Sequence, residues 1–265
     1  MDLLLKSVIL GIVEGVTEFL PISSTGHLII LNRFLDFEGD FAKMFDIVIQ
    51  LGAILSVVVY FRDRIFPFGA GKSGDQKKSI WEMWWKVAVG VLPAIIIGGL
   101  LGKKIQTFLF NPLTVAISLA AGGVILILVE RRKKTATIAS VAELRFPTAF
   151  SIGLFQCLSM IPGTSRAAAT IIGAMFLGAS RPVAVEFSFF LAIPTMIAAS
   201  GYSLLSHRVA VSSSEWIALA VGFAVSFVVA LGIIAFLMSY IRKHDFTPFG
   251  YYRIALAVVI VSVLL

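Results

Sequence analysis

Charged residues are scarce in this chain, and their scarcity excludes most soluble proteins. Only 14% of the 265 residues are Asp, Glu, Lys or Arg, whereas 58% are hydrophobic and the mean hydropathy is +0.97. An ordinary soluble domain carries about 25% charged residues. A water-soluble globular protein is therefore excluded, and apolar runs near the bilayer length indicate a polytopic all-α membrane protein.

Cysteine and the common cofactor motifs are also missing. Cys157 is the only cysteine, which excludes a disulfide scaffold. The sequence contains no Walker loop, glycine-rich dinucleotide fingerprint or Cys/His metal cluster. Basic residues outnumber acidic ones by 22 to 15. In a membrane protein this excess orients the loops, so we expect no nucleic-acid partner. The N-terminus lacks a basic region, and we expect no cleavable signal peptide.

Ten apolar segments follow one another in what we expect to be a single integral membrane domain, residues 1–265. The segments 22–34 and 166–178 are too short to span, because 13 residues of helix cover ~20 Å of a ~30 Å hydrocarbon core. We expect each to form a re-entrant pair with the segment before it, 3–20 or 146–161. The other six are predicted transmembrane helices, at 44–61, 86–101, 111–129, 183–205, 215–240 and 249–265.

The order of these segments repeats along the chain. Gly11–Glu14 resembles Gly153–Gln156 at an offset of 142 residues, and a proline and a hydroxyl-rich turn follow each stretch. We predict two repeats, at about 1–130 and 146–265, each with one re-entrant helical pair and three transmembrane helices. An odd number of crossings per half makes this an inverted-topology repeat, with function expected where the broken helices meet.

Loop charges predict the orientation in the membrane. Thirteen basic residues fall on one side, mostly in the loops 62–85 and 130–145, and five fall on the other. Because basic loops stay in the cytoplasm, both termini are expected to be extracytoplasmic. The thirteen are Arg62, Arg64, Lys72, Lys77, Lys78, Arg131, Arg132, Lys133, Lys134, Arg145, Arg181, Arg242 and Lys243, and the five are Lys6, Lys43, Lys103, Lys104 and Arg208.

Glu14 and Glu18 are the first candidates for chemistry. They lie one turn apart on one face of an apolar helix, where an ionisable side chain is costly and marks function by default. Two like charges in low dielectric raise one pKa unless a cation lies between them. The pair therefore predicts a divalent-metal site or a general acid/base pair. Pairing with an arginine is the structural alternative.

A hydroxyl-rich turn follows, in which Pro21 ends the first helix. The new helix begins with free N–H groups, which predict an anion site, above all for phosphate. His27 lies three residues after Ser24, so one helical turn can bring the two side chains together. The turn residues expected to bind the anion are Ser23, Ser24, Thr25 and Gly26.

The second half breaks in the same way at Pro162–Gly163. Arg166 adds a planar guanidinium suited to phosphoryl oxygens. Two helix N-termini, one arginine and a carboxylate pair at the repeat interface predict a cradle for a diphosphate with a metal ion. The alternative is that Arg166 only balances Glu14 or Glu18. The hydroxyls expected to contribute here are Thr164, Ser165 and Thr170.

Three stretches resemble the bacterial undecaprenyl-diphosphate phosphatase family, known for bacitracin resistance: Glu14–His27 (EGVTEFLPISSTGH), Pro162–Arg166 and Glu186–Phe189. The resemblance covers the chain end to end. It implies removal of the terminal phosphate of undecaprenyl diphosphate, the carrier lipid of cell-wall synthesis, in the plasma membrane. It also implies a divalent cation and an inverted repeat with re-entrant helices. The matching positions with implied catalytic or phosphate-binding roles are Glu14, Glu18, Ser24, His27, Ser165, Arg166 and Thr170.

The chain departs from that family at one point. The family usually continues its second motif as Ser-Arg-Ser-Gly, whereas Ala167 and Ala168 follow Arg166 here. One hydroxyl is thus missing from the expected cradle, and any role of that position is in doubt.

These observations predict a polyprenyl-diphosphate phosphatase. Glu14 and Glu18 hold Mg²⁺ or Ca²⁺ or act as acid and base, while Arg166 binds the diphosphate. Ser24 is the favoured nucleophile, with His27 or an activated water as alternatives. A transporter or lipid flippase is the rival, because broken helices in inverted repeats are typical of transporters. The oligomeric state stays open, a homodimer included.

Weaker signals come from four further residues. We expect Asp46 and Glu186, at equivalent repeat positions, to orient or cap the broken helices. His207 and His244 are expected to be solvated loop residues.

Overall fold

The computed structural model describes residues 1–69, 71–132, 135–206 and 211–265. Within these ranges the chain is helical, and β pairing is limited to one bridge between Ile138 and Ala179. The predictions for Lys133, Lys134, His207 and Arg208 concern positions outside the described residues. The helices are α1 (Leu3–Thr17), α2 (Ser24–Phe34), α3 (Asp40–Tyr60), α4 (Arg62–Ile65), α5 (Gly74–Leu109), α6 (Pro112–Arg131), α7 (Phe146–Cys157), α8 (Arg166–Phe176), α9 (Arg181–Ser206), α10 (Ser213–Tyr240) and α11 (Thr247–Leu264), with 3₁₀ turns η1 (Val141–Glu143) and η2 (Leu158–Met160).

Six of the described helices are long and apolar enough to cross a membrane: α3, α5, α6, α9, α10 and α11. They coincide with the six predicted spans, which confirms the polytopic all-α fold. Helix α5 is longer than expected, because it begins at Gly74 inside the predicted loop 62–85. Residues 75–89 contain neither proline nor glycine to end a helix. Its 36 residues extend ~54 Å, well beyond the hydrocarbon core.

Besides the four-residue α4, the described helices too short to span are α1, α2, α7 and α8, with 15, 11, 12 and 11 residues. In each short pair the turn between the two helices contains a proline, Pro21 in the first pair and Pro162 in the second. Proline lacks an N–H and disfavours helical backbone at the residue before it, so neither pair continues as one helix. These are the two predicted helix breaks.

The two halves pack in matched ways. Helix α1 lies on α10 as α7 lies on α5, and the equivalent helices of the two halves also pack on each other, α3 on α9 and α6 on α11. Glycine permits both crossings, since a Cβ at Gly11 would meet the carbonyl of Gly222 and one at Gly153 would meet that of Gly90. Helices α2 and α8 begin and end 142 residues apart. This packing supports two repeats, while their opposite orientation in the membrane stays a prediction.

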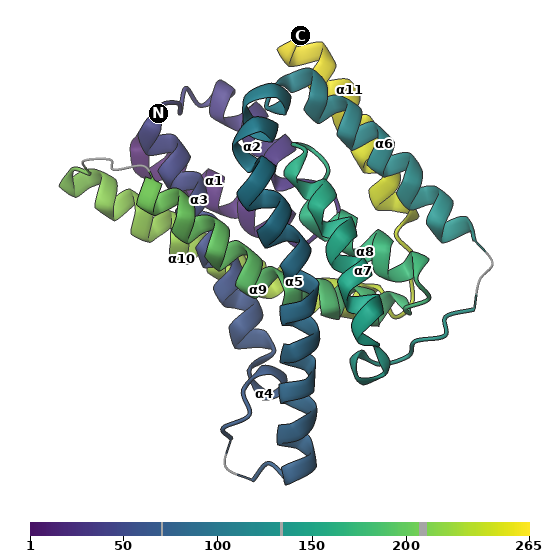
Figure 1. Ribbon diagram of the computed structural model, residues 1–265. Coiled ribbons are helices and arrows are strands. Elements are labelled where there is room, and N and C mark those ends of the chain that lie inside the picture. The colour runs from purple at the N-terminus through teal and green to yellow at the C-terminus, as the bar shows by residue number, and fades with distance from the viewer. Residues whose placement is uncertain (70, 133–134, 207–210) are drawn as a thin grey trace.

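Figure 1 shows both termini at the same end of the molecule, with α4 and the start of α5 at the opposite end. An even number of spans places the termini on one side of a membrane, and the six candidate spans satisfy this.

Buried phenylalanines fix the end of α1 against its neighbours. Phe19 makes an edge-to-face contact with Phe189 of α9, with ring centroids 5.2 Å apart, and Phe61 makes a similar contact with Phe190 at 5.3 Å. Phe19 and Phe189 are fully buried. Because Glu18 precedes Phe19, this packing sets the position of its carboxylate.

Candidate active site

The two helix breaks share an unusual backbone. Ser23 and Ser165 adopt left-handed conformations, with φ of 74° and 68°, and cap the helices that follow. The Ser23 hydroxyl accepts a hydrogen bond from the Gly26 amide at 3.3 Å, and the Ser165 hydroxyl accepts one from the Ala168 amide at 3.2 Å. Non-glycine residues in this region cost about 1–3 kcal/mol each unless their surroundings hold them. The fold therefore maintains strain at both breaks.

Arg253 of α11 holds the two breaks together. Its fully buried guanidinium donates to the Pro21 carbonyl of the first break at 3.2 Å. It also donates to the Gly163 and Thr164 carbonyls of the second, at 3.1 and 3.0 Å, and to two carbonyls of α6. Carbonyls that bind one guanidinium must lie close together. The structure thus brings the two breaks to one place.

Sequence reasoning missed Arg253, although a signal was present. An arginine inside the apolar segment 249–265 is a functional candidate by the same rule that selected Glu14. Its partners lie about 90 and 230 positions away in the chain, so no local pattern reveals them. Gly122 makes room for it, because a Cβ there would collide with the guanidinium.

Glu18, Ser24 and Arg166 form the centre of the site. The Ser24 hydroxyl donates to Glu18 Oε2 at 2.7 Å, and Arg166 Nη2 donates to Glu18 Oε1 at 3.1 Å. The side chains of both ion-pair members are more than nine-tenths buried. A buried carboxylate is thus shared between a hydroxyl and a guanidinium. The charge-assisted bonds hold the serine oxygen in a defined direction.

A second layer of hydroxyls orients Arg166. Its Nη1 donates to the carbonyl and the hydroxyl of Ser188, at 3.1 and 3.3 Å. The Thr170 hydroxyl lies 2.6 Å from that of Ser188 and also bonds to the Arg166 carbonyl. Thr170 is fully buried, so it acts through Arg166. The Arg166 Nε is buried and has no hydrogen-bond partner among the described residues, which leaves one donor for an anion.

His27 does not contact Ser24 in the way the spacing suggested. Its Nδ1 bonds to the Ser23 carbonyl at 2.7 Å, and its Nε2 bonds to the Tyr252 hydroxyl at 2.7 Å. Since a carbonyl only accepts, Nδ1 carries a proton, and in the neutral imidazole Nε2 then accepts from Tyr252. The ring turns back to its own helix cap, while the Ser24 hydroxyl turns to Glu18. Tyr252, which stacks on the imidazole, has no sequence signal of its own.

The Glu14 carboxyl lies beside that of Glu18 and has no hydrogen-bond donor as a partner among the described residues. It is fully buried, and neither carboxylate oxygen accepts a hydrogen bond from a described residue. An unpaired buried charge is costly, so the carboxyl requires a proton or a cation. The described residues contain no group of three His, Cys, Asp or Glu side chains placed to hold a metal ion. A cation here would therefore need further oxygens, as Mg²⁺ commonly takes from substrate phosphates and water.

The remaining sequence candidates divide between the breaks and their supports. Thr25 lies in the first turn of α2, and Thr164 precedes the cap of α8. Asp46 accepts a hydrogen bond from Asn32 of α2 at 3.0 Å, which agrees with a role in orienting the broken helix. Glu186 pairs with Arg64 of α4 at 2.8 Å and so contacts neither break through this bond.

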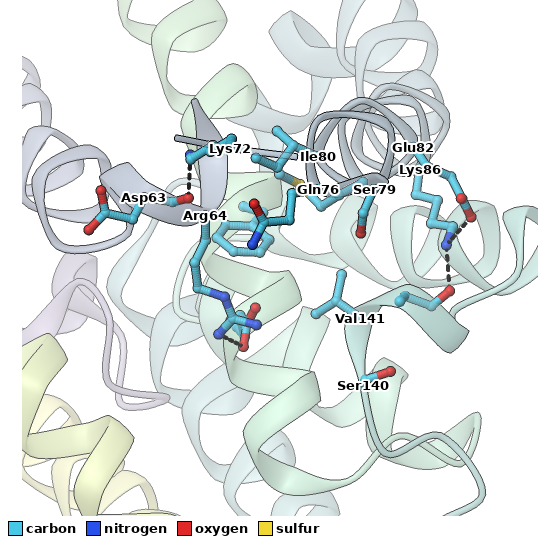
Figure 2. A pocket seen from close by; sticks show the side chains of 14 residues that line it. Asp63, Arg64, Lys72, Gln76, Ser79, Ile80, Glu82, Lys86, Ser140 and Val141 are labelled. Carbon is cyan, nitrogen blue, oxygen red and sulfur yellow. Dashed lines mark hydrogen bonds and ion pairs between the residues drawn. The ribbon is translucent and has the colours of Figure 1, made fainter. Parts of the chain in front are cut away.

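Glu186 belongs to a separate pocket of about 290 Å³ beside α4 and α5 (Figure 2). Its cations are already engaged: Arg64 by Glu186, Lys72 by the Asp63 carbonyl and Lys86 by Glu82. The Arg64–Glu186 pair ties α4 to α9. The pocket therefore lacks the uncommitted donors that the helix breaks offer.

The comparisons with known proteins agree with this geometry. Residues 7–259 match the profile of the family described as bacitracin resistance protein BacA. The chain belongs to this family. It is 47% identical over 266 residues to the undecaprenyl-diphosphatase of Enterococcus faecalis, covering 98% of this chain and 96% of that one. It is 48% identical over 259 residues to undecaprenyl-diphosphatase 1 of Clostridioides difficile, covering 97% and 94%. The family predicted from three short stretches is therefore confirmed over nearly the whole chain.

Proposed function

We propose that this chain hydrolyses undecaprenyl diphosphate to undecaprenyl phosphate and inorganic phosphate. The observation that carries the proposal is the buried group of Ser24, Glu18 and Arg166 at two helix N-termini. It combines a hydroxyl, a proton acceptor and a cation, which together suit phosphoryl transfer. The names of the two relatives support the same activity.

In the proposed reaction, the Ser24 oxygen attacks the terminal phosphorus and its proton passes to Glu18 across their hydrogen bond. The bond from that phosphorus to the bridging oxygen breaks, and undecaprenyl phosphate leaves. Water then hydrolyses the phosphoserine, which releases inorganic phosphate and restores the hydroxyl. Covalent catalysis divides one difficult displacement into two easier steps. The neutral His27 supplies a base for the water once Tyr252 gives up its hydrogen bond.

Positive charge at the site comes from Arg166 and the first amides of α2 and α8. Helix N-termini favour anions, and Arg166 adds a permanent positive charge and its one uncommitted donor, Nε. Such preorganised charge is the main protein contribution to phosphoryl transfer. Arg253 does not face the substrate in this scheme; it keeps the two N-termini together.

We expect Glu14 to hold a hard divalent cation, Mg²⁺ or Ca²⁺, together with oxygens of the substrate. Its two uncommitted oxygens fit that role. Glu18 fits it less well, because Arg166 and Ser24 already engage both of its oxygens. When bound, the cation supplies Lewis-acid charge to phosphoryl oxygens.

We place the enzyme in the bacterial plasma membrane with both termini extracytoplasmic. The distribution of basic loop residues supports this orientation. The first re-entrant pair then enters from the extracytoplasmic side. Broken helices are also typical of transporters, but a serine hydroxyl bonded to a buried glutamate favours the enzyme.

The test is phosphate release from undecaprenyl diphosphate by the purified protein in detergent with Mg²⁺ or Ca²⁺. We expect turnover by the wild type and none by Ser24→Ala. Ser151→Ala is the matched control, since Ser151 bonds only to its own helix carbonyl at Pro147. Absence of release with either metal would contradict the proposed function.

A further inference from the structure

One face of helix α1 borders an apolar groove. Gly11 and Gly15 lie against α10, and Glu14 and Glu18 lie on the face toward the site. A third face carries Ile12, Val13 and Val16 at the i, i+1, i+4 spacing of one helical stripe, and Leu20 follows in the turn after α1. Val13 and Val16 pack partly on the core and stay half-buried, and Ile12 is exposed, so the stripe keeps apolar surface toward the groove.

An apolar groove of about 500 Å³ lies over that stripe. Its other wall is the first turns of α11, where Pro248, Phe249 and Tyr252 follow the same i, i+1, i+4 spacing. Helix α11 packs mainly on α6 and α2, so the two walls belong to helices that are not close partners. The groove has an accessible mouth, because Ile12 is 42% and Tyr252 is 46% exposed.

The polar groups of the groove gather beside the helix break. Thr17 donates its hydroxyl to its own helix at the Val13 carbonyl and so offers no polar contact. His27 and Tyr252 bond to each other, next to Ile22 of the break. The groove is therefore an apolar channel that leads from the lipid-facing surface to the histidine of the candidate site.

We propose that this groove holds the first isoprene units of the substrate chain, which rests on the proposed phosphatase function. A prenyl diphosphate needs apolar contacts next to its charged head, and the groove supplies them at the one place where it meets the site. The stretch from Ile12 to Leu20 is ~12 Å long. It therefore receives only the start of a long chain, and the rest stays in the bilayer. Its volume is typical of a ligand pocket.

The test compares two diphosphates, undecaprenyl diphosphate and the five-carbon isopentenyl diphosphate, whose chain is too short to fill the groove. Ile12→Trp and Val16→Trp narrow the groove without touching Glu14 or Glu18. We expect each to raise KM for the long substrate about tenfold, which corresponds to ~1.4 kcal/mol. We expect kcat and the hydrolysis of the short substrate to stay within about twofold. Ile117→Trp on α6, a residue 60% exposed, is the matched control and should change neither.

A second measurement uses the wild-type protein, so that it does not depend on a variant folding. A prenyl diphosphate with a photoreactive group on its first isoprene unit should label peptides containing residues 12–22 and 248–252. Excess undecaprenyl diphosphate should displace that labelling. Labelling displaced by phospholipid alone would assign the groove to ordinary lipid. An equal loss of activity of the tryptophan variants toward both substrates, or no loss toward either, would also overturn the proposed role of the groove. No hydrolysis by the wild type would refute the phosphatase function itself.

Discussion

The two helix breaks have the same backbone and different side chains. Ser23 and Ser165, 142 residues apart, adopt the same left-handed conformation and cap α2 and α8 through the same bond. At the next position the first break carries Ser24 and the second Arg166. The repeat therefore supplies two capped helix N-termini, while divergence between the halves places the hydroxyl that we propose as nucleophile at one and the guanidinium at the other.

The helices before the two breaks, α1 and α7, also carry different side chains at equivalent positions. Glu14 of α1 corresponds to Gln156 of α7 at the same offset, and both are buried. Gln156 donates to Thr195 at 3.2 Å, whereas Glu14 has no partner among the described residues. One half thus carries a neutral, hydrogen-bonded amide where the other carries a carboxylate that needs a proton or a cation. This asymmetry places the proposed cation site in the first half.

The largest expected effect is that of Ser24→Ala, which removes the group unique to the first break. Turnover of undecaprenyl diphosphate should fall at least ~10³-fold, because loss of a nucleophile has effects of this size or larger. The melting temperature should change little, since Ser23 and not Ser24 caps α2. Phosphate release measures the loss of turnover, and trapping of a phosphoserine tests the covalent step. An active Ser24→Ala, or a trapped phosphohistidine, would transfer the role to water or His27.

Substitution of Arg166 tests the group unique to the second break. Arg166→Lys keeps the charge but loses the planar fork, and Arg166→Ala loses both. We expect losses of ~10²-fold for Lys and ~10³-fold or more for Ala, the range found for single charge-stabilising donors. Arg64→Lys, in the separate pocket, is the control. A folded Arg166→Ala variant with near wild-type kcat/KM would reduce Arg166 to a counter-ion of Glu18.

Exchanging the two buried positions on α1 and α7 sharpens the asymmetry. Glu14→Gln should lower turnover ~10²-fold and weaken the dependence of rate on Mg²⁺ concentration, while wild type in EDTA should be inactive. Gln156→Glu should leave that metal dependence unchanged and lower the melting temperature, because it buries a carboxylate beside Thr195. Metal titrations and thermal scans measure both. Full wild-type activity in EDTA would remove the metal from Glu14 and leave it as an acid or base.

Arg253→Lys tests whether the two breaks must be held together. An ammonium has no fork to reach carbonyls of both breaks and of α6, and each carbonyl left unbonded costs about 1–3 kcal/mol. We expect a lower melting temperature and a fall in kcat of ~10-fold with a smaller change in KM. Activity that is unchanged despite lower thermal stability would show that Arg253 stabilises the fold without positioning the site.

The smallest perturbation tests the opposite orientation of the two halves. Single cysteines at Asp75 and Thr135, in a Cys157→Ala background, should resist an impermeant thiol reagent applied to intact cells. A cysteine at Ser214, near the start of α10, should react. The activity of all three should stay near that of wild type. Labelling at residues 75 and 135 from outside would reverse the topology.

The sequence by itself determined the spans, the breaks and most of the residues at them. Segment length, hydropathy and the prolines at 21 and 162 act over one or two helical turns, so local reading suffices for them. It also selected Glu14, Glu18 and Arg166, because charges in apolar segments are costly wherever those segments pack.

Only the tertiary structure decided which of these groups bond to one another. Glu18 meets Arg166 across 148 positions, His27 meets Tyr252 across 225, and Arg253 meets Pro21 across 232. The sequence spacing suggested Ser24 with His27, whereas the fold directs Ser24 to Glu18 and leaves Glu14 unpaired. Hydrogen bonds act over about 3 Å. The crossing of α1 with α10 and of α7 with α5, and not distance along the chain, therefore determines the partners.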